Sequence, residues 1–222
     1  MISKLPIWVW VGGDVLALIA GIINAVGLIG FEHQAVSHMT GVTSQLGLAL
    51  AQGDTPLLQR FLLILVSFFI GAILSGCIVR DSTLKLGRRY GVALGVESLM
   101  LFLSIPLLIQ HHPLGACLAS CACGLQNGLA STYSGAIIRT THVSGLLTDV
   151  GLILGNLVVG NRPDLRRLIL SFSLIVAFLL GGYLGALLFM RFEYHSLYLP
   201  AALTGVMALG YGVFLWKRRI PS

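Results

Sequence analysis

The residues best suited to bind a ligand lie in two short polar phrases, each set among apolar stretches of the chain. The phrases cover residues 37–47 and 141–151, and each contains His, an apolar residue, a hydroxyl residue and Gly in that order. Hydroxyls, imidazoles and exposed backbone in this pattern favour non-covalent binding of a small solute. The candidate binding residues are His38, Thr40, Gly41, Thr43, Ser44, His142, Ser144, Gly145 and Thr148.

The expected chemistry is anion binding at helix N-termini. A helix that begins near Thr40-Gly41, or near Ser144-Gly145, would expose its first N–H groups, which have no intrahelical acceptor and carry partial positive charge. Such helix ends bind anions, hydroxyls can cap them or contact the ligand, and Gly allows close approach of the backbone. We expect the two ends, one from each phrase, to meet near the centre of a membrane.

Two carboxyl groups in apolar segments are candidates for coupling a proton or a cation to transport. An ionised Asp149 at the bilayer centre would cost about 2.5–3.5 kcal/mol on insertion scales, and its counterpart in the first phrase is neutral Gln45. The alternative is a structural hydrogen bond to Asn127 or to a backbone amide. Glu97 is also a carboxyl group in an apolar segment, and either a coupling role or a structural role is open to it. Supporting amides that connect the phrases to neighbouring helices are expected at Asn24, Gln45, Gln126 and Asn127.

Composition indicates a polytopic membrane protein. Of 222 residues, 56% are hydrophobic and 10% are charged, against about 25% charged residues in soluble domains. Most cations flank apolar runs, so the net charge of +6 indicates orientation in a membrane rather than nucleic-acid binding. The four Cys lie within apolar runs and lack zinc-site spacing, so we expect neither a metal nor another cofactor.

The fold expected is a single all-α membrane domain over residues 1–222, built as an inverted repeat of two halves, 8–110 and 113–216. The two phrase segments, 34–53 and 137–160, have helical parts of about 11–15 residues, or about 16–22 Å, which is short for an apolar core of about 30 Å. Six full transmembrane helices are predicted at 8–30, 57–79, 90–110, 113–131, 167–190 and 197–216.

The distribution of positive charge favours re-entrant phrase segments. If both segments dip into the membrane and return, only Arg60 and Arg191 of the 14 Lys and Arg lie outside, and both termini are cytoplasmic. This agrees with the positive-inside rule. The alternative, in which the segments cross as broken helices, keeps the repeat but loses the charge asymmetry. Interrupted helices at matched positions of two halves indicate a transport site between them.

The chain resembles the YoaK family of small bacterial multipass proteins over nearly its whole length. The resemblance rests on the phrase segments and on the run Gly124-Leu125-Gln126-Asn127. It implies a bacterial inner-membrane protein and supplies no substrate.

Together these features predict a small secondary transporter or facilitator for a small, anionic solute, with the option of proton coupling. A passive ion channel and a non-transport membrane scaffold or sensor remain alternatives. An enzyme is not expected, because the chain shows no nucleophile motif, metal spacing or phosphate loop. Stripes of small residues leave a homodimer open.

Overall fold

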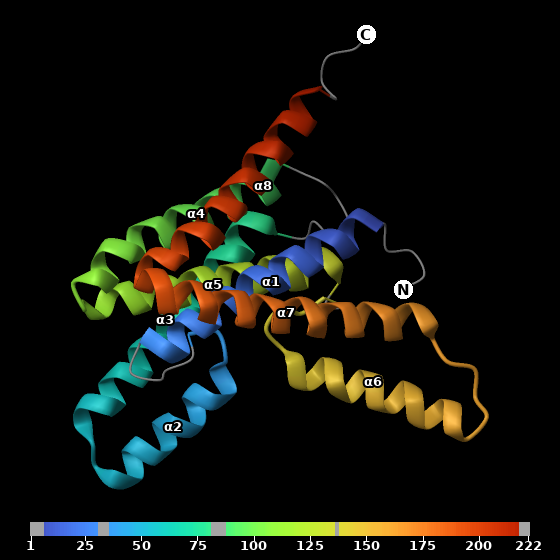
Figure 1. Cartoon of the computed structure of the whole chain (residues 1–222), viewed down its shortest axis with the longest axis horizontal. Coiled ribbons are helices and arrows are strands. Elements are labelled where there is room, and N and C mark those ends of the chain that lie inside the picture. Colours follow the sequence, from blue (N-terminus) through green and yellow to red (C-terminus); the bar gives the residue numbers. More distant parts are fainter. Residues whose placement is uncertain (1–6, 31–35, 81–87, 136–137, 218–222) are drawn as a thin grey trace.

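A computed structural model of the chain describes residues 7–30, 36–80, 88–135 and 138–217 (Figure 1). These residues form helices joined by short turns and contain no strand, so the prediction of an all-α protein is confirmed. The elements in order are α1 (Ile7–Gly30), α2 (Met39–Gln52), α3 (Thr55–Val79), α4 (Arg88–Ile109), α5 (Pro113–Ser134), α6 (Val143–Val158), α7 (Leu165–Phe192), the 3-10 helix η2 (Glu193–Leu197) and α8 (Tyr198–Lys217).

Within the described residues, four helical stretches are long and apolar enough to cross a membrane. Three are single helices, and the fourth is the 49-residue stretch Leu165–Val213, which joins α7, η2 and α8. Since one crossing needs about 20 residues, the 49 residues of this stretch are more than a single crossing requires. The chain is therefore a helical membrane protein.

The six predicted long helices correspond to α1, α3, α4, α5, α7 and α8, with ends that differ by at most three residues. Helices α3 and α7 both begin two residues earlier than predicted because an Asp caps each one. Asp54 Oδ1 accepts a hydrogen bond from the backbone N–H of Leu57, and Asp164 Oδ1 accepts one from that of Arg167, each at 3.1 Å. Such caps satisfy N–H groups that have no partner within the helix.

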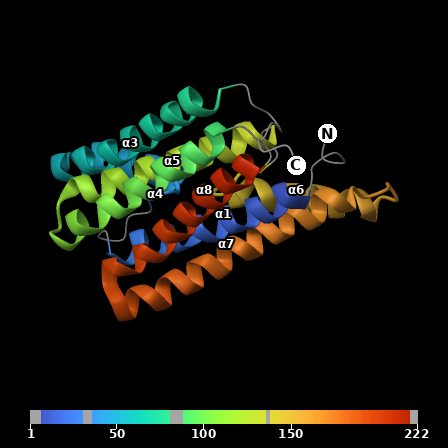
Figure 2. The ribbon, with the colours of Figure 1, turned by 90° about the horizontal axis from the view of Figure 1, so that it is seen from above.

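The most extensive helix contacts in the bundle are those of α1 with α7 and of α3 with α5 (Figure 2). Glycines make both contacts close. A Cβ on Gly21 would meet the carbonyl oxygen of Phe178, and a Cβ on Gly124 would meet that of Phe68. Small residues at these positions allow the backbones to approach. Each pair joins one helix from residues 8–110 to one from residues 113–216.

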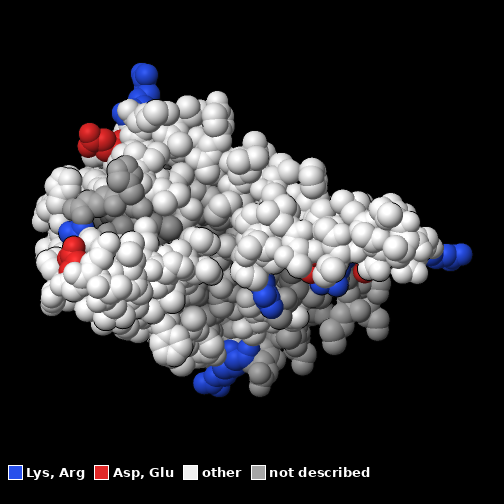
Figure 3. All heavy atoms as spheres, turned by 90° about the horizontal axis from the view of Figure 1, so that it is seen from below, with Lys and Arg blue, Asp and Glu red and all other residues white. Residues whose placement is uncertain are grey.

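Helices α2 and α6 project from the same side of this bundle (Figure 1). Each forms a hairpin with the long helix that follows it and packs on that helix alone among the described elements. The face that carries them shows few charged side chains among uncharged surface (Figure 3). The predicted phrase segments thus contain helices of 14 and 16 residues. Their first residues, 34–35 and 137, lie outside the described residues.

Candidate functional site

A cavity of about 670 Å³ lies between the starts of α2 and α6. Both phrases reach it, and so do the middles of α3 and α7, near Phe68 and Phe178. The two short helices therefore begin about half-way along the long helices on which they pack. The cavity is lined by Asn24, Ser37, His38, Met39, Thr40, Phe68, Asn127, Ser131, Arg139, Thr141, His142, Val143, Ser144, Ile175, Phe178 and Leu179.

The two helix starts have the same backbone geometry. His38 is the N-cap of α2 with φ −101° and ψ 77°, and His142 is the N-cap of α6 with φ −102° and ψ 60°. Neither N-cap side chain makes a capping hydrogen bond, so each helix lacks this intramolecular acceptor for its first-turn N–H groups. The helices begin at Met39 and Val143, one residue before the predicted starts.

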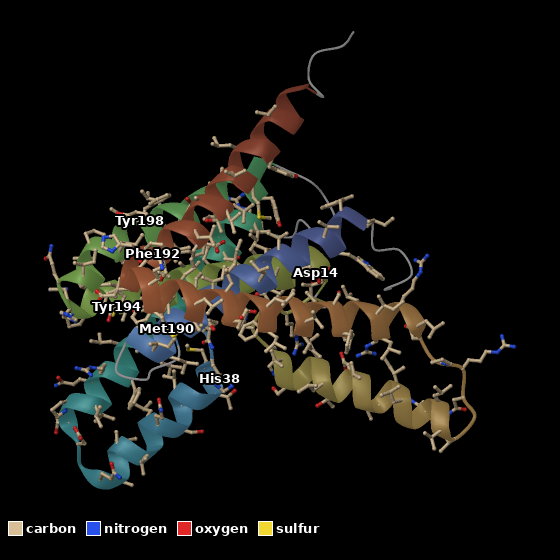
Figure 4. All side chains as sticks on the ribbon, in the orientation of Figure 1. Asp14, His38, Met190, Phe192, Tyr194 and Tyr198 are labelled. Atoms are coloured by element: carbon tan, nitrogen blue, oxygen red, sulfur yellow. The ribbon has the colours of Figure 1, made fainter. Side chains whose placement is uncertain are left out.

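Each N-cap His folds back over the first turn of its own helix. A Cβ on Gly41 would lie 2.7 Å from His38 Nδ1, and a Cβ on Gly145 would overlap the ring of His142 in the same way. These Gly residues are thus required by the position of the imidazoles, whereas the sequence suggested only that they allow close backbone approach. Figure 4 places His38 at the start of α2.

A hydroxyl–amide pair ties each phrase to the first helix of its own half. Ser37 Oγ donates to Asn24 Oδ1 at 2.8 Å, and Thr141 Oγ1 donates to Asn127 Oδ1 at 3.3 Å. With the oxygen of each amide engaged in this way, its NH₂ group is available to donate elsewhere. Both Asn residues line the cavity.

Arg139 brings a formal positive charge to the cavity. Its Nη1 lies 3.4 Å from His142 Nδ1, which accepts because a guanidinium can only donate. Among the described residues that line the cavity, none is acidic. Its lining thus combines one cation, two helix N-termini and several hydrogen-bond donors.

Three predicted hydroxyls lie on exposed faces of α2 and α6 outside the cavity lining. Thr43 Oγ1 donates to the carbonyl of Met39 at 2.8 Å, Ser44 Oγ to that of Thr40 at 3.1 Å, and Thr148 Oγ1 to that of Ser144 at 2.9 Å. Each is bonded four residues back within its own helix, so none of them caps a helix end. Gln45 is also exposed.

Asp149 pairs with Arg167 across the α6–α7 hairpin, with Nη2 and Oδ1 2.8 Å apart. The carboxylate's partner is therefore this guanidinium, not Asn127. The two side chains are 31% and 46% exposed, respectively, and neither residue lines the cavity. A cation at this distance offsets the negative charge of Asp149 within the hairpin.

Glu97 and Gln126 lie in the interior of the bundle. Glu97 is fully buried in α4, and among the residues that the structure describes neither of its oxygens has a hydrogen-bond partner. Gln126 Nε2 donates to the carbonyl of Leu16 at 2.6 Å, so this amide joins α5 to α1 rather than to a phrase. Its Oε1 is buried without a partner.

Sequence analysis did not single out several residues of the cavity lining, namely Ser37, Arg139, Thr141, Phe68 and Phe178. The sequence did carry a signal for the two Phe. Each lies three residues before a pair of small residues spaced four apart, Gly71 with Ser75 after Phe68 and Gly181 with Gly185 after Phe178. Gly21 packs closely against the carbonyl of Phe178, and Gly124 against that of Phe68. These Gly residues lie about one helical turn before Asn24 and Asn127, respectively. These Gly–Phe contacts explain why each Phe lies at the same cavity as the Asn residues.

Comparison with known proteins gives one match, to the family model DUF1275, described as a protein of unknown function, over residues 13–210. The chain belongs to the DUF1275 family. The resemblance to the YoaK family seen in the sequence is thereby confirmed, since that family is part of DUF1275. The DUF1275 match covers both phrases and all the residues that line the cavity. No curated protein and no solved structure matches the chain.

Proposed function

We propose that this DUF1275 member is a small secondary transporter or facilitator that binds a small anion between the N-termini of α2 and α6. One observation carries the proposal: both helix starts, each with an uncapped first turn, line a single cavity. Each N-terminus has the effect of about half a positive charge. Two such ends facing one space favour an anionic occupant, which accepts hydrogen bonds from the exposed N–H groups.

The other lining groups support the same class of ligand. Arg139 supplies a full positive charge, and the NH₂ groups of Asn24 and Asn127 can donate because their oxygens already accept from Ser37 and Thr141. Phe68 and Phe178 add apolar surface from α3 and α7. A cavity of about 670 Å³ lies in the size range of small-molecule sites.

The arrangement that we propose in the membrane is an inverted repeat of six crossing helices and two re-entrant half-helices. The 14 residues of α2 and the 16 of α6 span about 21–24 Å at 1.5 Å per residue, less than the apolar thickness of about 30 Å. With both termini in the cytoplasm, Arg60 and Arg191 alone face outward, which satisfies the positive-inside rule. The membrane is then a bacterial inner membrane.

Alternating access follows from the two close helix pairs. Because α1 packs on α7 and α5 packs on α3, each close pair contains one helix of each half. A rocking motion of one close pair against the other, which leaves the contacts within each pair intact, would open the cavity first to one side of the membrane and then to the other.

Tracer uptake into liposomes that contain the purified full-length protein tests this proposal. The probes are chloride, phosphate, sulfate, acetate and benzoate, each measured against the neutral solute glycerol. We expect saturable uptake of at least one anion and none of glycerol. Arg139→Gln should weaken uptake by raising the half-saturation concentration, whereas the matched charge change Arg191→Gln, at an exposed position outside the cavity lining, should not.

The outcomes separate the rival functions. Non-saturable flux that follows the voltage alone would indicate a channel. No flux of any probe, from protein shown to be folded by its helical circular dichroism, would favour a scaffold or sensor. Equal losses in Arg139→Gln and Arg191→Gln would mean that the cavity is not the anion site.

A further inference from the structure

The carboxyl group of Glu97 is buried in the interior of the bundle. It is 0% exposed, and neither oxygen has a partner among the described residues. Its helix face points toward α5: Leu108 lies three turns further along the same face of α4, and a Cβ on Gly115 of α5 would meet its side chain. Ser98, the next residue, faces α8, where its hydroxyl donates to the carbonyl of Ala201 at 2.7 Å.

An ionised carboxylate cannot persist in such a place without a cation or hydrogen-bond donors. A protonated carboxyl removes the charge and becomes a donor itself. Gln126 Oε1, on the adjoining helix α5, is a buried acceptor that has no donor. Helices α4 and α5 meet at a junction, and each holds one buried polar group without a hydrogen-bond partner among the described residues, the acid on α4 and the amide oxygen on α5.

A second cavity, of about 450 Å³, leads from one end of the bundle toward this junction. Trp8 near the start of α1 and Ser134 at the end of α5 line it. Tyr90 and Leu94 of α4 line it too, and Glu97 lies on the next turn beyond Leu94. The termini of α1 and α5 that border it are at the end assigned above to the cytoplasm.

Helix α5 packs on α4, the helix that carries Glu97, and also reaches the candidate anion cavity. Gln126 faces the interior, where it donates to the carbonyl of Leu16, and the adjacent Asn127 lines the anion cavity and accepts from Thr141. A shift of α5 at Gln126 therefore moves Asn127 directly.

We propose that Glu97 is a proton-binding site, reached from the cytoplasmic end through the second cavity, and that its protonation acts on the anion cavity through Gln126 and Asn127. The proton comes from water at that end and bonds to a carboxylate oxygen, and the same bond breaks when the site empties. Proton occupancy stands by itself, whereas the coupling to an anion depends on the function proposed above. Asp149 is less suited to this role, because Arg167 balances its charge.

The surroundings of Glu97 contain few other groups that titrate. They are Tyr90 on α4 itself, Cys121 and Cys123 on α5, and Tyr211 on α8, which stacks on Tyr90 with ring centroids 5.2 Å apart. Phenols and thiols of these types are neutral near pH 7. From α3 the free thiol is Cys77, which is exposed, and η2 carries Glu193, Tyr194 and His195 at the opposite end of α4.

Infrared spectroscopy of the full-length protein in lipid tests proton occupancy without any knowledge of the solute. We expect the wild type at neutral pH to show the C=O stretching band of a protonated carboxyl group, shifted in D₂O. Glu97→Gln, a neutral isostere, should lose this band. Glu193→Gln, at an exposed carboxyl, should keep the band. Asp14→Asn, which removes a different carboxyl on α1, should keep it too. Absence of the band in the wild type, or its survival in Glu97→Gln, would overturn the proposal.

Liposome uptake tests the coupling. With an inward proton gradient, the wild type should accumulate whichever probe anion it transports, whereas Glu97→Gln should exchange that anion at equal pH and fail to accumulate it. Gradient-driven accumulation by Glu97→Gln would refute the coupling. If the wild type moves none of the probes, the proposed transport function fails, and the infrared band alone then decides whether Glu97 binds a proton.

Discussion

The hairpins α2–α3 and α6–α7 are alike where they face the cavity and at the turns between their helices, and they differ in the contacts that hold the two helices of each hairpin together. In both, a His N-cap folds over a Gly, and a hydroxyl one residue before the His donates to an Asn of the preceding long helix. In both, an Asp caps the second helix of the hairpin. Matched groups therefore gather at the cavity.

The fastening of each hairpin is different. Helix α2 packs on α3 through a small apolar cluster formed by Val42, Ala49, Phe61 and Ile64. Helix α6 also buries apolar side chains, Leu146 and Ile153, but it is joined to α7 in addition by the ion pair between Asp149 and Arg167. Gln45, the counterpart of Asp149, is exposed. A feature present in one half only is more simply explained by attachment of that hairpin than by a role in the shared site.

The largest expected effect tests whether the two close helix pairs are equivalent. Gly21→Ala and Gly124→Ala place a Cβ against the backbone carbonyls of Phe178 and Phe68, so each should lower the free energy of unfolding by about 1–3 kcal/mol. Gly76→Ala, where nothing lies within 4 Å of a Cβ, is the control. Thermal unfolding in detergent measures all three, and a loss confined to one half would break the equivalence.

The next effect concerns the His residues that fold over the helix starts. Gly41→Ala and Gly145→Ala should displace the rings of His38 and His142 and weaken anion binding by roughly tenfold, or about 1.4 kcal/mol. The control is Gly47→Ala, also in α2 but with open space around its Cβ. Binding of the transported probe is measured by isothermal calorimetry. Unchanged affinity in both variants would remove the His residues from the site.

A smaller effect is expected from the hydroxyl–amide pairs. Ser37→Ala and Thr141→Val each remove one hydrogen bond, for about 1 kcal/mol of stability, and the shorter bond of Ser37, 2.8 Å against 3.3 Å, should give the larger loss. Ser44→Ala, which removes a bond within α2 only, serves as the control in the same thermal unfolding assay. A larger loss for Thr141→Val would contradict this order.

The smallest effect is expected at the ion pair. Because Asp149 and Arg167 are both partly exposed, a double-mutant cycle of Asp149→Asn and Arg167→Gln should give a coupling energy of about 0.2–1 kcal/mol. Uptake of the probe anion should persist in Asp149→Asn. Complete loss of gradient-driven uptake in that variant, with stability unchanged, would instead make Asp149 the coupling carboxylate.

Much of the fold could be predicted from the sequence because a bilayer restricts the options. Apolar runs near 20 residues in length predict helices, and the ends of α1, α3, α4, α5, α7 and α8 lie within three residues of the prediction. The residual errors have local causes, such as the Asp54 and Asp164 caps. The starts of α2 and α6 were each displaced by one residue, because His38 and His142 serve as the N-caps.

The candidate site was less predictable, because the repeat identified phrases but could not show which of their side chains share a space. Thr43, Ser44 and Thr148 belong to the phrases, yet their hydroxyls bond within their own helices. Phe68 and Phe178 lie far from the phrases in sequence and still line the cavity. Helical rotation decides these cases, since neighbouring residues point about 100° apart.

The sequence by itself determined the helices, the membrane environment and the two matched phrases, because hydropathy, run length and repetition are properties of the chain read in order. Tertiary structure alone decided that both phrases open on one cavity, that Asp149 meets Arg167, and that Glu97 has no hydrogen-bond partner in the described part of the chain. These facts depend on which helices pack together. That packing was set by glycines such as Gly21 and Gly124, which bring α1 against α7 and α5 against α3.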